Sequence, residues 1–271
     1  MSWSEFEYSV ANGQPLTLYE FIRGGVMFYR YTNADRDIDL SGVRWMAHAI
    51  SDSGLSAGSG NGLEITVPAS NGVALLFRGL PPSQPVLIRV YRLHAGDSSV
   101  MLKTVWVGTV SEVKREAIDR CKLLTNSLAS TFTRVGLRLT FSRACPHALY
   151  DHNCRVNATS FALYGMAIVA LDGASITVNL PAGTEPERFS GGYVEWVTEG
   201  VTERRGLRAQ AGHRLSLFGG SAGLAVGQTV TLYPGCDHTI ALCNSRFSNH
   251  LNFGGVPHMP GKSPFQIIKL F

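Results

Sequence analysis

The sequence is poor in charged residues. Asp, Glu, Lys and Arg make up 16% of its 271 residues, whereas about 25% is usual for soluble domains. Hydrophobic residues reach 45%, so an isolated monomer would expose a surface with unusually few charges. This balance predicts a subunit that packs against neighbouring proteins.

Long apolar runs and basic blocks are also missing. No stretch reaches the roughly 18 apolar residues that a bilayer-spanning helix needs, and the opening MSWSEFE lacks the basic and apolar regions of a signal peptide. We therefore expect no membrane insertion and synthesis in a reducing cytoplasm. The formal net charge of +4 is small, and the basic residues are spread along the chain. No specific nucleic-acid partner is expected.

Motifs for phosphate binding and zinc hydrolysis are absent from the sequence. The glycine-rich tract 54–62 contains neither G-x-G-x-x-G nor G-x-x-x-x-G-K-[ST], the patterns that cradle a phosphate between a strand and a helix. We expect this tract to be a loop. The H-E-x-x-H motif of zinc hydrolases does not occur either. We predict that the protein is not an enzyme.

Short runs of alternating apolar and polar residues dominate the first half of the chain. They predict a mostly antiparallel sheet or a barrel. The runs are 16–19, 26–31, 63–67, 86–91 and 101–107. One or two helical turns are expected at 71–77, closed by the Pro81-Pro82 pair that follows.

Two hairpins are predicted in the second half. In the first, strands 166–171 and 176–180 flank Asp172-Gly173, a dipeptide typical of tight hairpin turns. In the second, strands 193–197 and 204–208 flank Glu199-Gly200. Both hairpins lie between the second and third of four C-terminal cysteines, and they predict a small β module inserted there.

These patterns predict a mainly β fold with short helices (β/α+β), in three parts. Residues 1–140 form a β-barrel or sandwich domain. Residues 141–248 form a four-cysteine domain with the inserted β module at about 160–232. Residues 249–271 form an extended C-terminal tail that adheres to its own body or to a neighbour.

Four of the five cysteines form two closely spaced pairs. Eight residues separate Cys145 from Cys154, and six separate Cys236 from Cys243. Two such loops can meet around one centre, whose thiolates select zinc or an iron-sulfur cluster over calcium or magnesium. Zinc sites favour loops of about two to four residues, so the longer loops suit a wider cluster at least as well. Spacing alone leaves a cluster, zinc and cysteines without a common site as alternatives.

Three sequence blocks resemble a family of phage tail proteins. They are ACPHALYDHNC at 144–154, PGCDHT at 234–239 followed by Cys243, and NFGGVPHMPG at 252–261. The family includes proteins similar to the minor tail protein L of phage lambda and to the hub proteins of gene-transfer-agent tails. The similarity is specific over much of 140–261 and looser over 1–140. The 81 residues between Cys154 and Cys236 form a longer span than in the lambda protein, which the inserted module would explain.

The resemblance implies a structural virion protein of the distal tail tip, assembled in the host cytoplasm. Residues 1–140 would form a ring, expected to be a homotrimer, between the distal tail or tube protein and the central fibre or tip-attachment protein. The resemblance also implies a [4Fe-4S] cluster on Cys145, Cys154, Cys236 and Cys243, with zinc on the same cysteines as the alternative. A hydrolase at the tail tip is the less favoured function.

The remaining cysteine and three histidines are not expected to bind the metal. Cys121 lies in the apolar context CKLL, where a lone cysteine is usually a small core residue. His147, His152 and His238 lie beside the ligand cysteines in the sequence. We predict that they support the site or lie at the surface.

Overall fold

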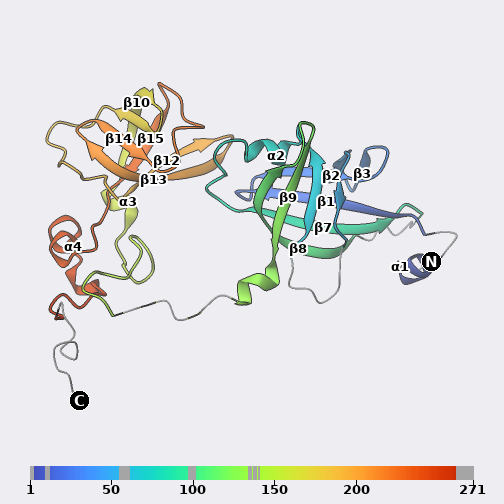
Figure 1. Ribbon diagram of the computed structural model, residues 1–271, viewed down its shortest axis with the longest axis horizontal. Coiled ribbons are helices and arrows are strands. Elements are labelled where there is room, and N and C mark those ends of the chain that lie inside the picture. Colours follow the sequence, from blue (N-terminus) through green and yellow to red (C-terminus); the bar gives the residue numbers. More distant parts are fainter. Residues whose placement is uncertain are drawn as a thin grey trace, which may run out of the picture. The chain divides into compact units, whose positions relative to one another are not determined.

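A computed structural model describes residues 3–9, 13–54, 62–96, 102–133, 136, 139 and 141–260. The chain divides into two compact units. Unit 1 comprises Met1–Arg134 with Val197–Glu203, and unit 2 comprises Val135–Trp196 with Arg204–Phe271. The structure is mainly β with a few short helices (Figure 1), which confirms the predicted fold class. Most of the predicted loop at 54–62, and residues 261–271 of the predicted tail, lie outside the described residues.

Unit 1 is built on one nine-stranded sheet with the strand order β3-β4-β2-β1-β7-β8-β9-β6-β5. Neighbouring strands are antiparallel except for the parallel pair of β2 and β4. Each predicted run of the first half overlaps one of these strands. The strands are β1 (Pro15–Arg23), β2 (Met27–Thr32), β3 (Ile38–Leu40), β4 (Val43–Ala47), β5 (Ser51–Asp52), β6 (Glu64–Pro68), β7 (Val86–His94), β8 (Lys103–Arg115) and β9 (Arg120–Ser127).

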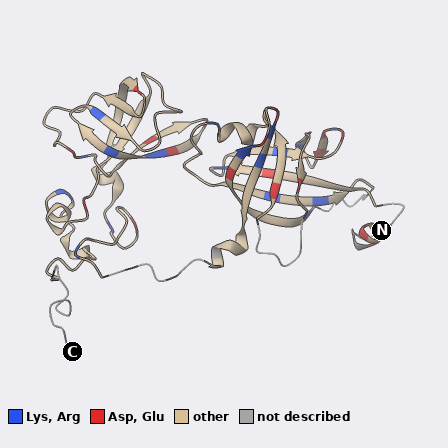
Figure 2. Cartoon of the chain, viewed as in Figure 1, with Lys and Arg blue, Asp and Glu red and all other residues tan. Residues whose placement is uncertain are grey.

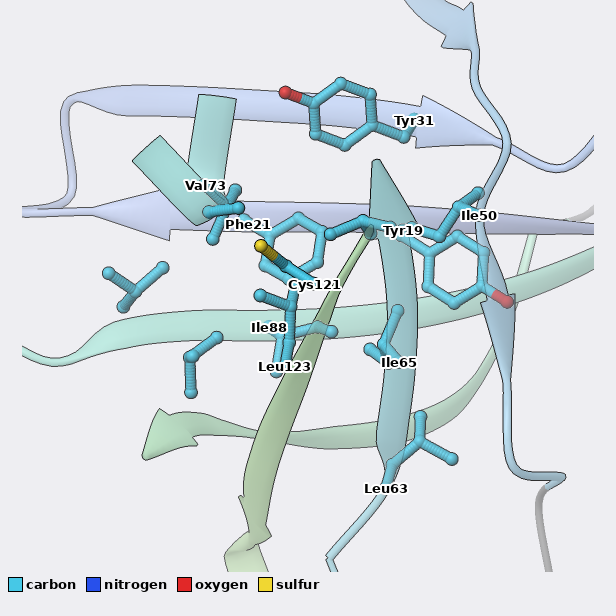
Figure 3. Close-up of a cluster of buried hydrophobic side chains, with 14 of the residues drawn as sticks. Tyr19, Phe21, Tyr31, Ile50, Leu63, Ile65, Val73, Ile88, Cys121 and Leu123 are labelled. Carbon is cyan, nitrogen blue, oxygen red and sulfur yellow. The ribbon is translucent and has the colours of Figure 1, made fainter. Parts of the chain in front are cut away.

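The core of unit 1 is formed by apolar side chains on one face of the sheet. Phe21, Ile88 and Leu123 come from three different strands and are fully buried (Figure 3). Cys121 lies among them at 6% exposure, so it is the small core residue that the sequence predicted. The expected helical turn at 71–77 is α2 (Gly72–Leu76), where the Asn71 side chain accepts a hydrogen bond from the Val73 amide at 2.9 Å.

In place of the expected barrel or sandwich of two sheets, residues 1–140 have one large sheet. The described strands of unit 1 form a single sheet with β3 at one edge and β5 at the other. Leu18 and Tyr19 are neighbours on β1, so their side chains point to opposite faces. Tyr19 belongs to the main core, whereas Leu18 packs with Trp45 and with the partly buried residues of β3 and β4. The β3-β4 end therefore buries its apolar side chains on the face of β1 opposite the main core.

Positive and negative side chains lie close together on the sheet of unit 1 (Figure 2). Glu20 lies 2.8 Å from Arg30 and 3.9 Å from Arg89, its partners across β2 and β7. Cross-strand pairs of opposite charge support an antiparallel register. Some of the few charges of this unit thus stabilise strand pairing.

Three helical segments complete the described elements of the unit, namely α1 (Trp3–Tyr8), α2 and the 3-10 helix η1 (Leu128–Thr133).

Unit 2 contains a closed six-stranded barrel in the span between Cys154 and Cys236. The strand order is β10-β11-β14-β13-β12-β15, and residues such as Ile168, Leu207 and Leu232 fill its interior. The strands are β10 (Leu163–Asp172), β11 (Ser175–Val178), β12 (Tyr193–Thr198), β13 (Val201–Ala211), β14 (Arg214–Leu217) and β15 (Thr229–Tyr233). The helices of unit 2 are α3 (Ala158–Phe161), α4 (Ile240–Phe247) and the 3-10 helix η2 (His250–Asn252).

Both predicted hairpins are present. Strands β10 and β11 pair with Asp172 opposite Ser175, and Gly173 has a φ of +54° in the turn. Between β12 and β13, Glu199 and Gly200 have φ values of +53° and +78°. Two successive positive φ angles are the signature of a type I′ hairpin turn. Local turn chemistry therefore determines these connections.

Candidate metal centre

All four predicted ligands line one small cavity of unit 2. Cys145, Cys154, Cys236 and Cys243 share it with His147 and His238. The cavity is small, with a volume of about 20 Å³. Cys145 and Cys154 come from the loop before α3, Cys236 follows β15, and Cys243 lies on α4. The fold thus brings together the two sequence pairs, although 81 residues lie between them.

The first loop is shaped by an aspartate inside it. One carboxylate oxygen of Asp151 accepts a hydrogen bond from the Cys154 amide at 2.6 Å, and the other accepts one from the Ala148 amide at 3.2 Å. Asp side chains commonly bond nearby backbone amides in this way and so stabilise turns. Tyr150 has a φ of +67° and donates from its hydroxyl to the Pro234 carbonyl at 2.7 Å. The loop is therefore tied both to itself and to the second cysteine pair.

The second cysteine pair, Cys236 and Cys243, is positioned by the start of helix α4. Asp237 accepts a hydrogen bond from the Thr239 amide at 2.8 Å. Thr239 is the N-cap of α4, and its hydroxyl oxygen accepts from the Leu242 amide at 3.2 Å. Thr and Asp are favoured at helix starts because their oxygens satisfy amides that have no partner in the helix. Cys243 is thereby held on the first turn of α4, within reach of the cavity that Cys236 lines.

His238 connects the two pairs and is not positioned as a free ligand. Its carbonyl accepts from the Cys145 amide at 2.9 Å, and its Nδ1 lies 2.9 Å from the Cys145 carbonyl oxygen. This second contact requires Nδ1 to carry the proton. His238 therefore links the two cysteine loops through hydrogen bonds. His152, also adjacent to a ligand cysteine in the sequence, is exposed.

The cysteine sulfurs accept hydrogen bonds from amide groups of three other residues. The His238 amide donates to Cys236 Sγ at 3.3 Å, and the Gly254 amide donates to Cys145 Sγ at 3.4 Å. The Asn249 side-chain amide donates to the Cys154 carbonyl at 2.6 Å and lies 4.0 Å from its Sγ. Donors aimed at ligand sulfurs are typical of iron-sulfur sites, where they stabilise the negative charge of the cluster.

Asn249 and Gly254 were not singled out in the sequence as sulfur donors. They belong to the segment that follows α4, which returns to the first cysteine loop. The Val256 amide donates to the Ser142 carbonyl at 2.8 Å, and the Arg143 side chain donates to the Met259 carbonyl. The described part of the predicted tail thus packs on its own unit. No local sequence signal marks these donors, because the contacts join residues about a hundred positions apart.

Burial makes the thiols of this cavity poor acids on their own. It raises the pKa of Cys236 and of Cys243, and the neighbouring cysteine sulfurs raise both further. Several thiolates in one buried site repel one another unless a cation compensates them. Among the described residues, no three His, Cys, Asp or Glu side chains are grouped closely enough to hold one metal ion. The thiols therefore surround a space and do not converge on a point.

Two stretches match the G-x-S-x-G pattern of serine hydrolases. That motif acts as a nucleophile elbow only in a sharp turn from a strand to a helix. The match at 54–58 lies almost entirely outside the described residues. In the match at 219–223, Ser221 donates to the Gly173 carbonyl at 2.7 Å, and strand β15 is the next regular element. Ser221 therefore supports a turn of the barrel and lacks the elbow context.

Comparisons with known proteins agree with the phage resemblance. A family model described as "Baseplate hub protein, N-terminal attachment domain" matches residues 16–157, just over half of the chain. A second model, "Phage conserved hypothetical protein BR0599", matches residues 187–263. The first range contains Cys145 and Cys154, and the second contains Cys236 and Cys243. The comparison with curated proteins finds no significant match.

A solved structure shares the fold over nearly the whole chain. It is titled "Virion of native gene transfer agent (GTA) particle" and aligns with a TM-score of 0.76 at 20% sequence identity. The alignment covers 96% of this chain and 93% of that one. The chain is a phage tail or hub type of protein, as the sequence resemblance implied. It belongs to the baseplate hub family whose N-terminal attachment domain it carries.

Several expectations from the sequence stay predictions. They are the specific relation to minor tail protein L, the position at the tail tip, the homotrimer and the cluster on the four cysteines. In the part of the chain that the structure describes, no helix has both the length and the apolar character needed to cross a membrane.

Proposed function

We propose that this protein is a structural component of the distal tail tip, with a C-terminal region stabilised by a [4Fe-4S] cluster. Cys145, Cys154, Cys236 and Cys243 would hold the cluster. Residues 1–140 would form a trimeric ring between the tail tube and the central fibre protein. The single observation that carries the cluster is the cavity that all four cysteines line, with amide donors on its sulfurs.

The chemistry of the donor set fits this group. A cluster would supply several iron atoms whose positive charge offsets the four thiolates, and it would bridge the two cysteine loops. Because the unfolded chain has no preformed site, the binding free energy becomes folding free energy. His238, Asp151 and Thr239 would keep the thiolates in place. The cluster needs no electron-transfer role to serve this purpose.

The surroundings of the sulfurs favour a cluster over a single zinc ion. Structural zinc sites bring four ligands within about 2.3 Å of one point. Here no three of the described His, Cys, Asp or Glu side chains are close enough together to hold one ion, and two backbone amides donate to sulfurs. Zinc on the same four cysteines is the second candidate, supported by the thiolate ligands alone.

Exposed apolar side chains support a role in assembly. Phe132 is 84% exposed, Phe141 is 90% exposed and Leu251 is 88% exposed. Large aromatic and aliphatic side chains at such exposure are favourable anchors for a partner. Together with the low charge content, they favour a subunit that packs into a larger particle. Other tail proteins, including a tube protein and a central fibre protein, are the proposed partners.

Metal analysis tests the cofactor. We expect protein purified without oxygen to be brown, with broad absorbance near roughly 400 nm and about four irons and four sulfides per chain. The measurement is iron, sulfide and zinc determination on the same sample. A colourless protein with about one zinc per chain would reject the cluster in favour of zinc.

Electron microscopy of intact tails tests the position. A subunit that joins a tube to a central fibre needs head-to-tail interfaces that close into a ring, since each contact then joins two different surface patches. We expect three copies in one ring at the distal end of the tail. Density for this fold in the head, the connector or the tube shaft would contradict the proposed location while leaving the cofactor untouched.

A further inference from the structure

A buried polar group in the cavity of the four cysteines has no partner among the described residues. His147 lines the cavity beside Cys145, and its Nδ1 is buried without a hydrogen bond to any described residue. Buried polar nitrogens nearly always have a partner, and an unpaired one in a native fold indicates a bound group, an ion or a water. His238, by contrast, already uses its Nδ1 on the Cys145 carbonyl.

The ring of His147 is held by a close backbone contact. A Cβ atom added to Gly254 would lie 2.2 Å from Nε2 of His147 and 2.7 Å from its Cδ2, so the backbone of Gly254 lies against the imidazole. The same glycine donates its amide to Cys145 Sγ at 3.4 Å. The imidazole therefore lies next to a ligand sulfur, and any larger residue at position 254 would displace it.

The volume and lining of the cavity restrict what Nδ1 can meet. The cavity is bounded mainly by thiols and by apolar side chains such as Leu149, Val156 and Phe247. A neutral or charged imidazole with a proton on Nδ1 is a donor. The lining also includes Asn249 and Asn252, and the side-chain oxygen of Asn249 already accepts from the Asn252 side-chain amide at 2.6 Å. Four thiol sulfurs line the same cavity, and a metal cluster bound by the thiolates would add further sulfur acceptors.

We propose that His147 donates a hydrogen bond from Nδ1 to a sulfur of the bound cluster and thereby raises its reduction potential. This proposal rests on the proposed cluster. His147 acts as a positioning and tuning residue, while the four cysteines remain the ligands. A donated hydrogen bond is stronger to the more negative, reduced state, so it favours reduction. Hydrogen bonds to the sulfurs are among the factors that set cluster potentials.

Three variants of the full chain separate this role from packing. His147→Phe keeps a planar ring against Gly254 but removes the donor. His147→Asn keeps an N–H at the position of Nδ1. His152→Phe is the matched control, because His152 is also near a ligand cysteine in the sequence but is exposed. Iron and sulfide content, the midpoint potential in an anaerobic titration and the rate of bleaching in air are measured for each.

We expect His147→Phe to retain the iron content of the wild type while its midpoint potential falls and its absorbance bleaches faster in air. His147→Asn should return both properties toward the wild-type values, and His152→Phe should change neither. An unchanged potential and bleaching rate in His147→Phe would overturn the donor role. Iron loss in His147→Phe as complete as in a cysteine variant would also overturn it, because His147 would then hold the cluster. Wild-type protein without iron would reject the cluster itself, a result distinct from both.

Discussion

Serine in place of any one of Cys145, Cys154, Cys236 or Cys243 is expected to remove most of the iron and to unfold the cysteine region of unit 2. The missing thiolate takes away a ligand, and the cluster loses the contact that links its two loops. Because binding free energy is folding free energy here, the loss should exceed about 4 kcal/mol. Iron analysis and urea unfolding of the full chain measure the two effects.

Cys121→Ser is the matched control for this series. Cys121 is buried in the core of unit 1 on β9, and the structure places it in a different unit from the four cavity cysteines. The substitution should leave the iron content unchanged and cost about 1 to 3 kcal/mol, because it buries a hydroxyl in place of a thiol. Iron loss in Cys121→Ser, or full iron in one of the four serine variants, would contradict the ligand assignment.

Gly235→Ala is expected to be nearly as damaging, although it removes no ligand. A Cβ at position 235 would lie 1.7 Å from the Ser190 carbonyl oxygen and 2.6 Å from the Gly192 amide nitrogen. These are backbone atoms, so the chain next to Cys236 must move. We expect a loss of about 3 kcal/mol or more in the free energy of unfolding, together with a lower iron content.

The control for Gly235→Ala is Gly136→Ala in the same unit. A Cβ added at Gly136 would have no described atom within 4 Å, and the residue has no left-handed φ, so the extra methyl group meets neither a clash nor backbone strain. Thermal unfolding of the two variants should therefore diverge clearly. Equal stability of both variants would contradict this prediction. It would show that the segment around Cys236 can shift easily to make room for a Cβ next to the Ser190 carbonyl oxygen.

Local signals in the sequence were sufficient for many of the elements. Asp172-Gly173 and Glu199-Gly200 predict hairpins because positive φ angles in a two-residue turn match the twist of paired strands. The Pro81-Pro82 pair predicts that the helical turn at 71–77 ends before it, as α2 does. Cys121 could be assigned to the core from its apolar neighbours. Each of these depends on residues that are close together in the chain.

The way in which distant strands assemble into a sheet or a barrel was not predictable in the same way. The alternating strands of the first half are compatible with a barrel, a sandwich or an open sheet, since all three bury one face of each strand. The tertiary structure decides that they form one nine-stranded sheet, with Leu18 and Trp45 packed on the face opposite Tyr19. The closed barrel instead lies in unit 2, where the sequence predicted a small inserted β module.

The sequence by itself determined the β class of the fold and the hairpin turns, and it singled out the four cysteines as candidate ligands. The β class follows from the alternation of apolar and polar side chains, the hairpins follow from turn residues, and the candidate ligands follow from the preference of soft metals for thiolates. All three are properties of short segments. Only the tertiary structure decided that the two cysteine pairs line one cavity, that Gly254 donates to Cys145 Sγ and that Nδ1 of His147 is buried without a partner among the described residues. Such contacts join residues about a hundred positions apart, and their geometry depends on the packing of every element between them.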